Sequence, residues 1–163
     1  MLRRLSLVSI VALLVLPAWA QAQFKQGDWA VTFQADGTAQ KDFDTFDLSL
    51  TAGPEYFLTD HISVGLKNTL SLADGGSDRS GAIRGFADWN FDLGRWVPYV
   101  GANIGYGYGD NIDDAWIAGP EGGVRYFVNS TTYIQAHIAY EFNLNEGFDE
   151  GAFFYGAGIG FKF

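Results

Sequence analysis

Apolar side chains recur at every second position along most of the chain, from Trp29 to the last residue. In the first such run, Trp29, Val31 and Phe33 alternate with Thr32 and Gln34. A period of two is typical of a β-strand, because successive side chains of a strand point to opposite faces. Eight runs of this kind follow one another with no helical segment between them, at residues 29–35, 46–58, 62–72, 83–93, 96–107, 116–128, 134–142 and 153–163. The sequence therefore predicts an all-β fold of eight strands.

The connections between these runs alternate between short and long. Residues 59–61, 94–95 and 129–131 form tight connections, whereas 37–42, 74–80, 109–114 and 145–150 are longer and rich in glycine and acidic residues. An antiparallel up-and-down barrel gives this pattern when one rim carries the loops and the other carries the turns. With an even number of strands, both chain ends then lie at the rim of tight turns.

The two faces of the strands differ in a way that indicates which one points outward. The polar face is rich in glycine, at Gly53, Gly65, Gly101, Gly105, Gly107, Gly123, Gly156, Gly158 and Gly160. Small residues suit the interior of an eight-stranded barrel, which has room only for side chains. The apolar face is continuous on nearly every strand and would be a large hydrophobic patch in water.

Aromatic residues gather near the strand ends on the apolar face, at Trp29, Tyr56, Trp89, Trp96, Trp116, Tyr126, Tyr140 and Phe163. Transmembrane barrels carry such girdles at the level of the lipid headgroups. The predicted fold is an eight-stranded antiparallel up-and-down transmembrane β-barrel.

Residues 1–22 have the three parts of a secretory signal peptide. Arg3 and Arg4 precede an apolar run from Leu5 to Leu16, and Pro17 is followed by small residues at Ala18, Ala20 and Ala22. The apolar run is shorter than the roughly 20 residues that a membrane-spanning helix needs. We expect cleavage after Ala20 or Ala22, which leaves residues 23–163 as the barrel domain.

The charge and the lack of cysteine exclude several functions. The formal net charge is −9, and removal of Arg3 and Arg4 leaves 8 basic against 19 acidic residues, or −11. Such a surface repels nucleic acid, so no nucleic-acid partner is expected. Because the chain has no cysteine, neither disulfides nor a cysteine-based zinc site can contribute to its stability.

The period of two places charged residues on the inner face of the barrel. The acids are Asp47, Asp88, Glu121 and Glu141, and the bases are Lys67, Arg84, Arg125 and Lys162, with His137 on the same face. Charges inside a narrow lumen must be paired or hydrated. We interpret them as an ion-pair and hydrogen-bond network that fills the lumen, and a narrow path for ions, water or small solutes is the alternative.

The acidic residues of the long connections form four clusters, of which the third is the densest: Asp36, Asp42 and Asp44; Asp74 and Asp78; Asp110, Asp113 and Asp114; and Glu146, Asp149 and Glu150. They are solvated loop residues or, as a sharper hypothesis, weak metal-site candidates that bind divalent cations and bridge to the anionic headgroups of lipopolysaccharide. The sequence of this cluster lacks the spacing of an EF-hand loop.

Two alternatives to a non-enzymatic transmembrane barrel are a secreted lipocalin and a barrel enzyme that modifies lipid A. Gly27, Asp28 and Trp29 match a short lipocalin motif, but a lipocalin is apolar inside. A lipid A-modifying enzyme needs a serine, a histidine and a carboxylate together on the lipid-facing side. His137 instead faces inward and is about 13 Å along its strand from Glu141, at about 3.3 Å per residue.

The end of the chain resembles the terminal strand of outer-membrane barrels. Residues 153–163 read FFYGAGIGFKF, with hydrophobic residues alternating back from a final phenylalanine. Residues 56–65, 98–102 and 123–128 are also similar to the small eight-stranded barrels, a family that includes the OmpA membrane domain, the opacity proteins and OmpX. The resemblance implies that Tyr155, Ile159, Phe161 and Phe163 form the signal recognised by the barrel-assembly machinery.

The same resemblance implies a bacterial outer-membrane location with both termini in the periplasm. It also implies contact with outer-membrane lipid and lipopolysaccharide, a monomeric state and no cofactor. The expected function is non-enzymatic, in envelope structure or surface interaction through four acidic extracellular loops.

Overall fold

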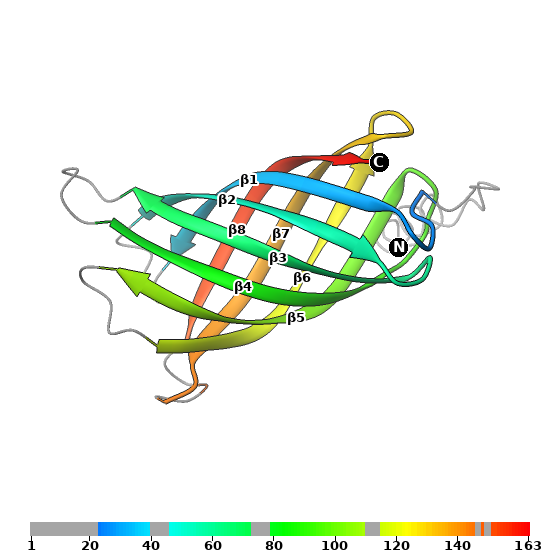
Figure 1. Cartoon of the computed structure of the whole chain (residues 1–163). Coiled ribbons are helices and arrows are strands. Elements are labelled where there is room, and N and C mark those ends of the chain that lie inside the picture. The colour runs from blue at the N-terminus through cyan, green and yellow to red at the C-terminus, as the bar shows by residue number, and fades with distance from the viewer. Residues whose placement is uncertain (1–22, 40–45, 73–78, 110–114, 146–147, 149–150) are drawn as a thin grey trace, which may run out of the picture.

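The computed structural model describes residues 23–39, 46–72, 79–109, 115–145, 148 and 151–163. Eight antiparallel strands form one closed barrel in which each strand pairs with its neighbours in the sequence (Figure 1). The strands are β1 (Trp29–Ala39), β2 (Phe46–Phe57), β3 (Ile62–Leu72), β4 (Arg79–Asn90), β5 (Trp96–Gly109), β6 (Ala115–Phe127), β7 (Thr132–Asn143) and β8 (Ala152–Lys162). The predicted fold class is confirmed. The predicted signal peptide lies outside the described residues, and none of the described residues belongs to a helix long and apolar enough to span a membrane.

The barrel closes where the first strand meets the last. Ala30 pairs with Lys162 and Ala39 pairs with Phe153, so β1 and β8 are in register along nearly their whole length. In Figure 1 the blue start of β1 and the red end of β8 lie at the same end of the barrel. That end also carries the three tight connections, and we call it the turn rim. The opposite end is the loop rim.

At the loop rim the strands extend further than the alternation of residue types predicts. β1 continues to Ala39, because Asp36 pairs with Gly156 of β8 and Ser49 of β2. The sequence analysis had grouped Asp36 with the loop acids, and this assignment is wrong. Backbone pairing on both sides of β1 keeps Asp36 inside the barrel, where its side chain is buried.

The exposed face of the barrel is apolar and its interior is polar. Leu70 and Trp116 are each 56% exposed, whereas Glu55, Asp88 and Arg125 are buried. This distribution is the reverse of a lipocalin's and rules out that alternative. It is the arrangement expected for strands that alternate between hydrocarbon and a filled lumen.

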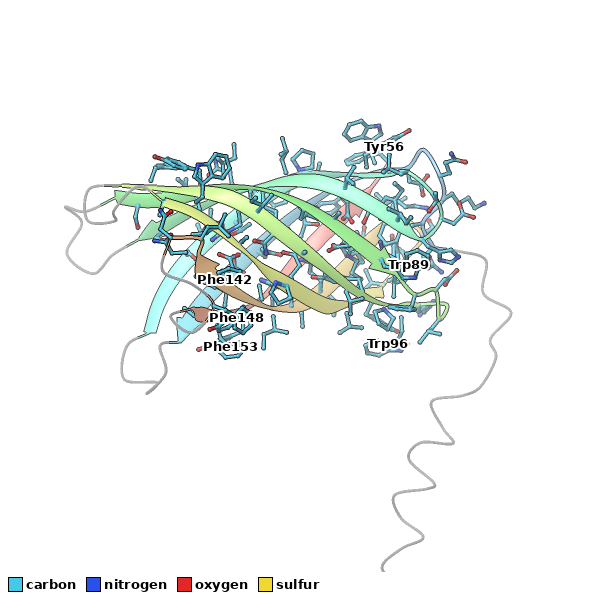
Figure 2. All side chains as sticks on the ribbon, turned by 90° about the horizontal axis from the view of Figure 1, so that it is seen from below. Tyr56, Trp89, Trp96, Phe142, Phe148 and Phe153 are labelled. Carbon is cyan, nitrogen blue, oxygen red and sulfur yellow. The ribbon has the colours of Figure 1, made fainter. Side chains whose placement is uncertain are left out.

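Aromatic side chains form a band at each end of the exposed face. Figure 2 shows Tyr56, Trp89 and Trp96 at the turn rim and Phe142, Phe148 and Phe153 at the other end. Within each band the rings are in contact across neighbouring strands. The ring centroids of Trp96 and Tyr126 are 4.7 Å apart, and those of Tyr140 and Phe153 are 4.8 Å apart. Two such bands separated by an aliphatic belt match the interfacial girdles of transmembrane barrels.

Interior glycines make room for the large side chains that cross the lumen. At Gly160 of β8 a Cβ atom would overlap the ring of Tyr133, which is fully buried and hydrogen-bonded to Thr32. At Gly123 it would lie 2.7 Å from the Tyr99 hydroxyl. The glycine-rich inner face is thus a packing requirement of the filled barrel.

Candidate functional site

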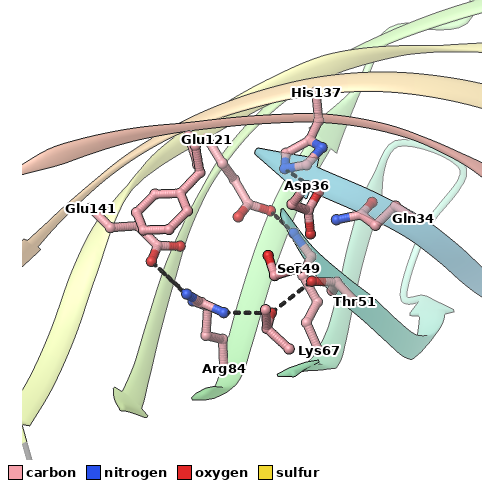
Figure 3. Close-up of a pocket in the computed structure, with 12 residues that line it drawn as sticks. Gln34, Asp36, Ser49, Thr51, Lys67, Arg84, Glu121, His137 and Glu141 are labelled. Atoms are coloured by element: carbon pink, nitrogen blue, oxygen red, sulfur yellow. Dashed lines mark hydrogen bonds and ion pairs between the residues drawn. The ribbon is translucent and has the colours of Figure 1, made fainter. Parts of the chain in front are cut away.

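Among the described residues of the lumen, three basic side chains each form the centre of an ion-paired cluster. In the first, Lys67 of β3 reaches across to Glu121 of β6, with Nζ 2.5 Å from Oε1 (Figure 3). Asn103 donates a hydrogen bond of 2.7 Å to the other carboxylate oxygen of Glu121. Both oxygens of this carboxylate therefore have a donor, as a buried charge requires.

The second cluster is centred on Arg84 of β4. Its Nε and Nη2 both donate to Oε2 of Glu141, at 3.0 and 2.8 Å. Its Nη1 donates to Thr69 at 2.8 Å, and the hydroxyls of Thr69 and Thr51 are 2.7 Å apart. The guanidinium thus connects four strands, β2, β3, β4 and β7, into one hydrogen-bonded chain (Figure 3).

The third cluster surrounds Arg125 of β6 and is the most deeply buried. Arg125 Nη2 lies 3.0 Å from Glu55 and 3.4 Å from Asp88, and Nη1 donates to the side-chain oxygen of Asn90 at 2.5 Å. The guanidinium also lies over the ring of Tyr99, 4.3 Å from its centroid. One cation against two carboxylates, in a side chain only 3% exposed, makes this cluster the electrostatic centre of the lumen.

A fourth pair in the lumen is formed by His137, which was predicted to lie there, and Asp36, which was not. His137 Nε2 lies 3.6 Å from Asp36 Oδ1, and Asp36 Oδ1 and His137 Nδ1 are both buried without a hydrogen-bond partner among the described residues. Both residues line a cavity of about 20 Å³. A cavity of that size accommodates about one water molecule.

The remaining predicted lumen residues lie elsewhere. Lys162 is at the turn rim, where its Nζ lies 3.1 Å from Asp28 and donates to the Gln23 carbonyl. Asp47 belongs to β2, but its side chain is outside the described residues, as are the metal-site candidates Asp110, Asp113 and Asp114. The described residues contain no group of three His, Cys, Asp or Glu side chains that could hold a metal ion.

The predicted insertion signal lies on the outward face of β8 and just beyond it. Tyr155, Ile159 and Phe161 are exposed on that face, and Phe163 is the most exposed of the large apolar residues described. The Phe163 amide donates to the Trp29 carbonyl at 2.8 Å, which extends the closing ladder to the end of the chain. Recognition by assembly machinery stays a prediction.

Glu55 was missed in the sequence analysis, although the signal was present. It stands two residues after Gly53, in the run whose polar face was already identified, so the same alternation places it inside. Its register partner on β3 is Gly65, where a Cβ atom would overlap the ring of Phe86.

The turn rim is closed by a cluster of apolar side chains that the sequence analysis also missed. We call this cluster the plug, and it consists of Phe24, Ala30, Phe57, Val97, Phe127 and Tyr133. Phe24 is 2% exposed and stacks on Phe57 with ring centroids 4.0 Å apart. Its ring also meets the rings of Phe127 and Tyr133 edge to face, at 5.0 and 5.6 Å.

Backbone hydrogen bonds hold the segment that carries Phe24 across the barrel mouth. Gly27 donates to the Phe57 carbonyl at 2.9 Å, and Phe57 donates to the Asp28 carbonyl at 3.0 Å. The Gln26 amide donates to Asp60 at 2.8 Å. At Gly27 the chain has φ of 93°, which glycine adopts readily, and this bend turns the segment inward.

Between the plug and the ion pairs there is little space. A second cavity of about 20 Å³ is lined by Glu55, Tyr99, Arg125 and Gln135 among others. Gln34, Thr51 and Lys67 line both cavities, and Gln135 of the second cavity donates to Gln34 across the lumen. Each of these two lumen cavities therefore has room for about one water molecule.

No protein-family model and no curated protein matches the sequence. Solved structures do match. The N-terminal β-barrel domain of Pseudomonas aeruginosa OprF aligns with a TM-score of 0.68 at 18% identity, over 86% of this chain and 100% of that domain. OprG of the same organism gives a TM-score of 0.64 at 16% identity, over 87% of this chain and 98% of that one.

Neisserial surface protein A aligns with a TM-score of 0.60 at 14% identity, over 83% of this chain and 94% of that one. At these identities the likeness concerns the fold. The chain has the fold of the small eight-stranded outer-membrane β-barrels.

Proposed function

We propose that this chain is a non-conducting, non-enzymatic outer-membrane barrel that acts in envelope structure or surface contact through its loop rim. The observation that carries the proposal is the filled lumen. Three ion-paired clusters cross it, and the plug closes the turn rim. A barrel without a path along its axis offers its partners only its rims and its lipid-facing surface.

The two rims differ in what they can offer a partner. In the proposed orientation both termini are periplasmic, so the tight connections face the periplasm and the four long connections face the outside. These long connections hold most of the acidic clusters of a chain with net charge −9. Lipopolysaccharide carries anionic headgroups, so divalent cations that bridge the two sets of oxygens would join the loop rim to the outer leaflet.

The lumen is expected to conduct no ions. In planar lipid bilayers the folded protein should give no current steps above the bare membrane, while a large porin in the same bilayer gives clear steps. Glu121→Gln removes one partner of the Lys67 ion pair and is the matched probe. Steady single-channel events whose amplitude changes in Glu121→Gln would contradict the proposal and support a narrow pore.

Loop carboxylates are expected to mediate cation-dependent binding of lipopolysaccharide. Barrels in nanodiscs should bind lipopolysaccharide more tightly with Ca²⁺ than with a chelator, and Asp113→Asn with Asp114→Asn should weaken the Ca²⁺-dependent part by about tenfold, a change of about 1.4 kcal/mol. The control is Asp60→Asn with Asp92→Asn at the turn rim. These two carboxylates accept backbone amides of Gln26 and Gly94, and asparagine keeps the acceptor. Equal losses in the two double variants would rule out the loop rim as the binding surface.

A further inference from the structure

A larger polar pocket, separate from the two lumen cavities, lies at the turn rim outside the plug. Its volume is about 340 Å³, far larger than the lumen cavities. Three basic side chains line it, from Lys25 before β1, Arg95 in the tight connection before β5, and Lys162 at the end of β8. Gln23, Phe127 at the end of β6, and Asn129 and Ser130 of the connection between β6 and β7 complete the wall.

The concentration of positive charge here is unusual for so acidic a chain. Residues 23–163 contain 8 lysines and arginines, of which Lys67, Arg84 and Arg125 are paired with acids inside the lumen. Three of the remaining five line this one pocket, and none of its lining residues is acidic. A pocket of this sign attracts anions against the net charge of the chain.

The acids of the turn rim are already occupied by the chain itself. Asp28 accepts the Lys25 amide at 2.9 Å and pairs with Lys162, while Asp60 and Asp92 accept the amides of Gln26 and Gly94. The side chains of Lys25 and Arg95 have no ion-pair partner among the described residues, and both residues are exposed. Two cations in the pocket are thus left uncompensated.

The neutral residues of the wall add hydrogen-bond donors. Asn129 uses its side-chain oxygen to accept the amides of Thr131 and Thr132, at 2.9 and 2.8 Å. Its Nδ2 group makes no hydrogen bond to the described residues, and Ser130 adds a hydroxyl to the same wall. Lysine ammonium, guanidinium, amide and hydroxyl donors around one opening form a set that suits the oxygens of a phosphate, which arginine can bind with two parallel hydrogen bonds.

We propose that this pocket binds a phosphate group, carried either by a phospholipid headgroup of the periplasmic leaflet or by free phosphate. The periplasmic placement rests on the proposed function, but the binding chemistry does not. Arg95 directly precedes Trp96, an exposed residue of the turn-rim aromatic band, which in a membrane lies at headgroup level. A headgroup phosphate is therefore within the natural reach of Arg95.

The test compares charge removal at the pocket with charge removal elsewhere in the chain. Protein folded in a maltoside detergent, which contains no phosphate, is titrated with phosphatidylglycerol and followed by native mass spectrometry. Inorganic phosphate is titrated separately and followed by ³¹P NMR. The site variant is Lys25→Gln with Arg95→Gln. The control is Lys41→Gln with Arg79→Gln, which removes two positive charges that are not among the residues lining the pocket.

The site variant should lose about tenfold in affinity, and the control should stay close to the wild type. Binding of the lipid but not of inorganic phosphate would identify the headgroup as the source, and the converse would identify free phosphate. Equal binding by all three proteins, or no binding in either titration, would overturn the proposal. The conductance experiment tests the lumen and the lipopolysaccharide experiment tests the loop rim. The proposed function can therefore be contradicted without affecting the phosphate site, and the phosphate site can be contradicted without affecting the proposed function. A heat-modifiability gel checks that each variant is folded.

Discussion

Replacing Arg125 by methionine is expected to lower the free energy of unfolding by about 3–5 kcal/mol. Arg125 is the only basic side chain bonded to Glu55 and Asp88 among the described residues, and all three side chains are at most 3% exposed. Methionine fills a similar volume but leaves two carboxylates buried without a positive partner. Breaking a buried ion pair from one side is costly because the remaining charge stays out of water.

Two further variants separate charge from packing at this cluster. Arg125→Met combined with Glu55→Gln and Asp88→Asn should recover most of the lost stability, since no uncompensated charge remains. The free energy of unfolding of Arg125→Lys should lie between those of Arg125→Met and the wild type. Lysine keeps the positive charge but lacks the planar guanidinium that bonds to Asn90 and Glu55 at the same time. Reversible urea unfolding in lipid vesicles, followed by tryptophan fluorescence, measures all three. If Arg125→Met alone is as stable as the wild type, water enters the lumen and hydrates Glu55 and Asp88.

Replacing Phe24 by alanine is expected to release residues 23–28, the segment before β1, from the barrel mouth. A buried phenylalanine cut back to alanine loses about 3–5 kcal/mol of packing, and Phe24 contacts the rings of Phe57, Phe127 and Tyr133. The segment that carries Phe24 precedes β1, so it can detach while the closed sheet stays intact. Hydrogen exchange at the amides of residues 26 and 27, which are bonded to Asp60 and Phe57, should rise steeply.

The matched control for the plug is Phe24→Met, which keeps most of the apolar volume and should cost less than about 1.5 kcal/mol. In Phe24→Ala the midpoint of global urea unfolding should change little, whereas the protection of amides 26 and 27 from hydrogen exchange should fall steeply. If exchange at residues 26 and 27 is unchanged in Phe24→Ala, the hydrogen bonds alone hold the segment and the aromatic packing is incidental. If the ladder of β1 and β8 also loses protection, the plug is part of the cooperative core.

The strands were predictable from the sequence because lipid and a filled lumen impose opposite demands on successive residues. The partners inside the lumen were not. Lys67 and Glu121 are 54 residues apart, and Arg125 and Glu55 are 70 residues apart. Which inner residues meet depends on how the strands are staggered around the barrel, and alternation of residue types carries no information about stagger.

The plug and Asp36 were missed for related reasons. Alternation assigns apolar residues to the outside, but Phe57, Val97 and Tyr133 are apolar and point inward near the turn rim. Strand parity would have placed these three correctly, had it been given priority over residue type. Phe24 precedes the first strand, so no periodicity applies to it. Asp36 was lost because Gly37 looked like the start of a loop, whereas it pairs with Leu48 and Tyr155 inside the sheet.

The pairing of Ala30 with Lys162 has a consequence for how the molecule is made. The seam joins the first and the last strand of the barrel, so it forms only after β8 is present. Until then the sheet has two unmatched margins, and in hydrocarbon each unmatched amide or carbonyl costs several kcal/mol. No partly assembled intermediate is stable in the bilayer by itself. Closure of the sheet is therefore expected to accompany insertion into the bilayer, and a chain that lacks β8 is not expected to form a stable membrane barrel.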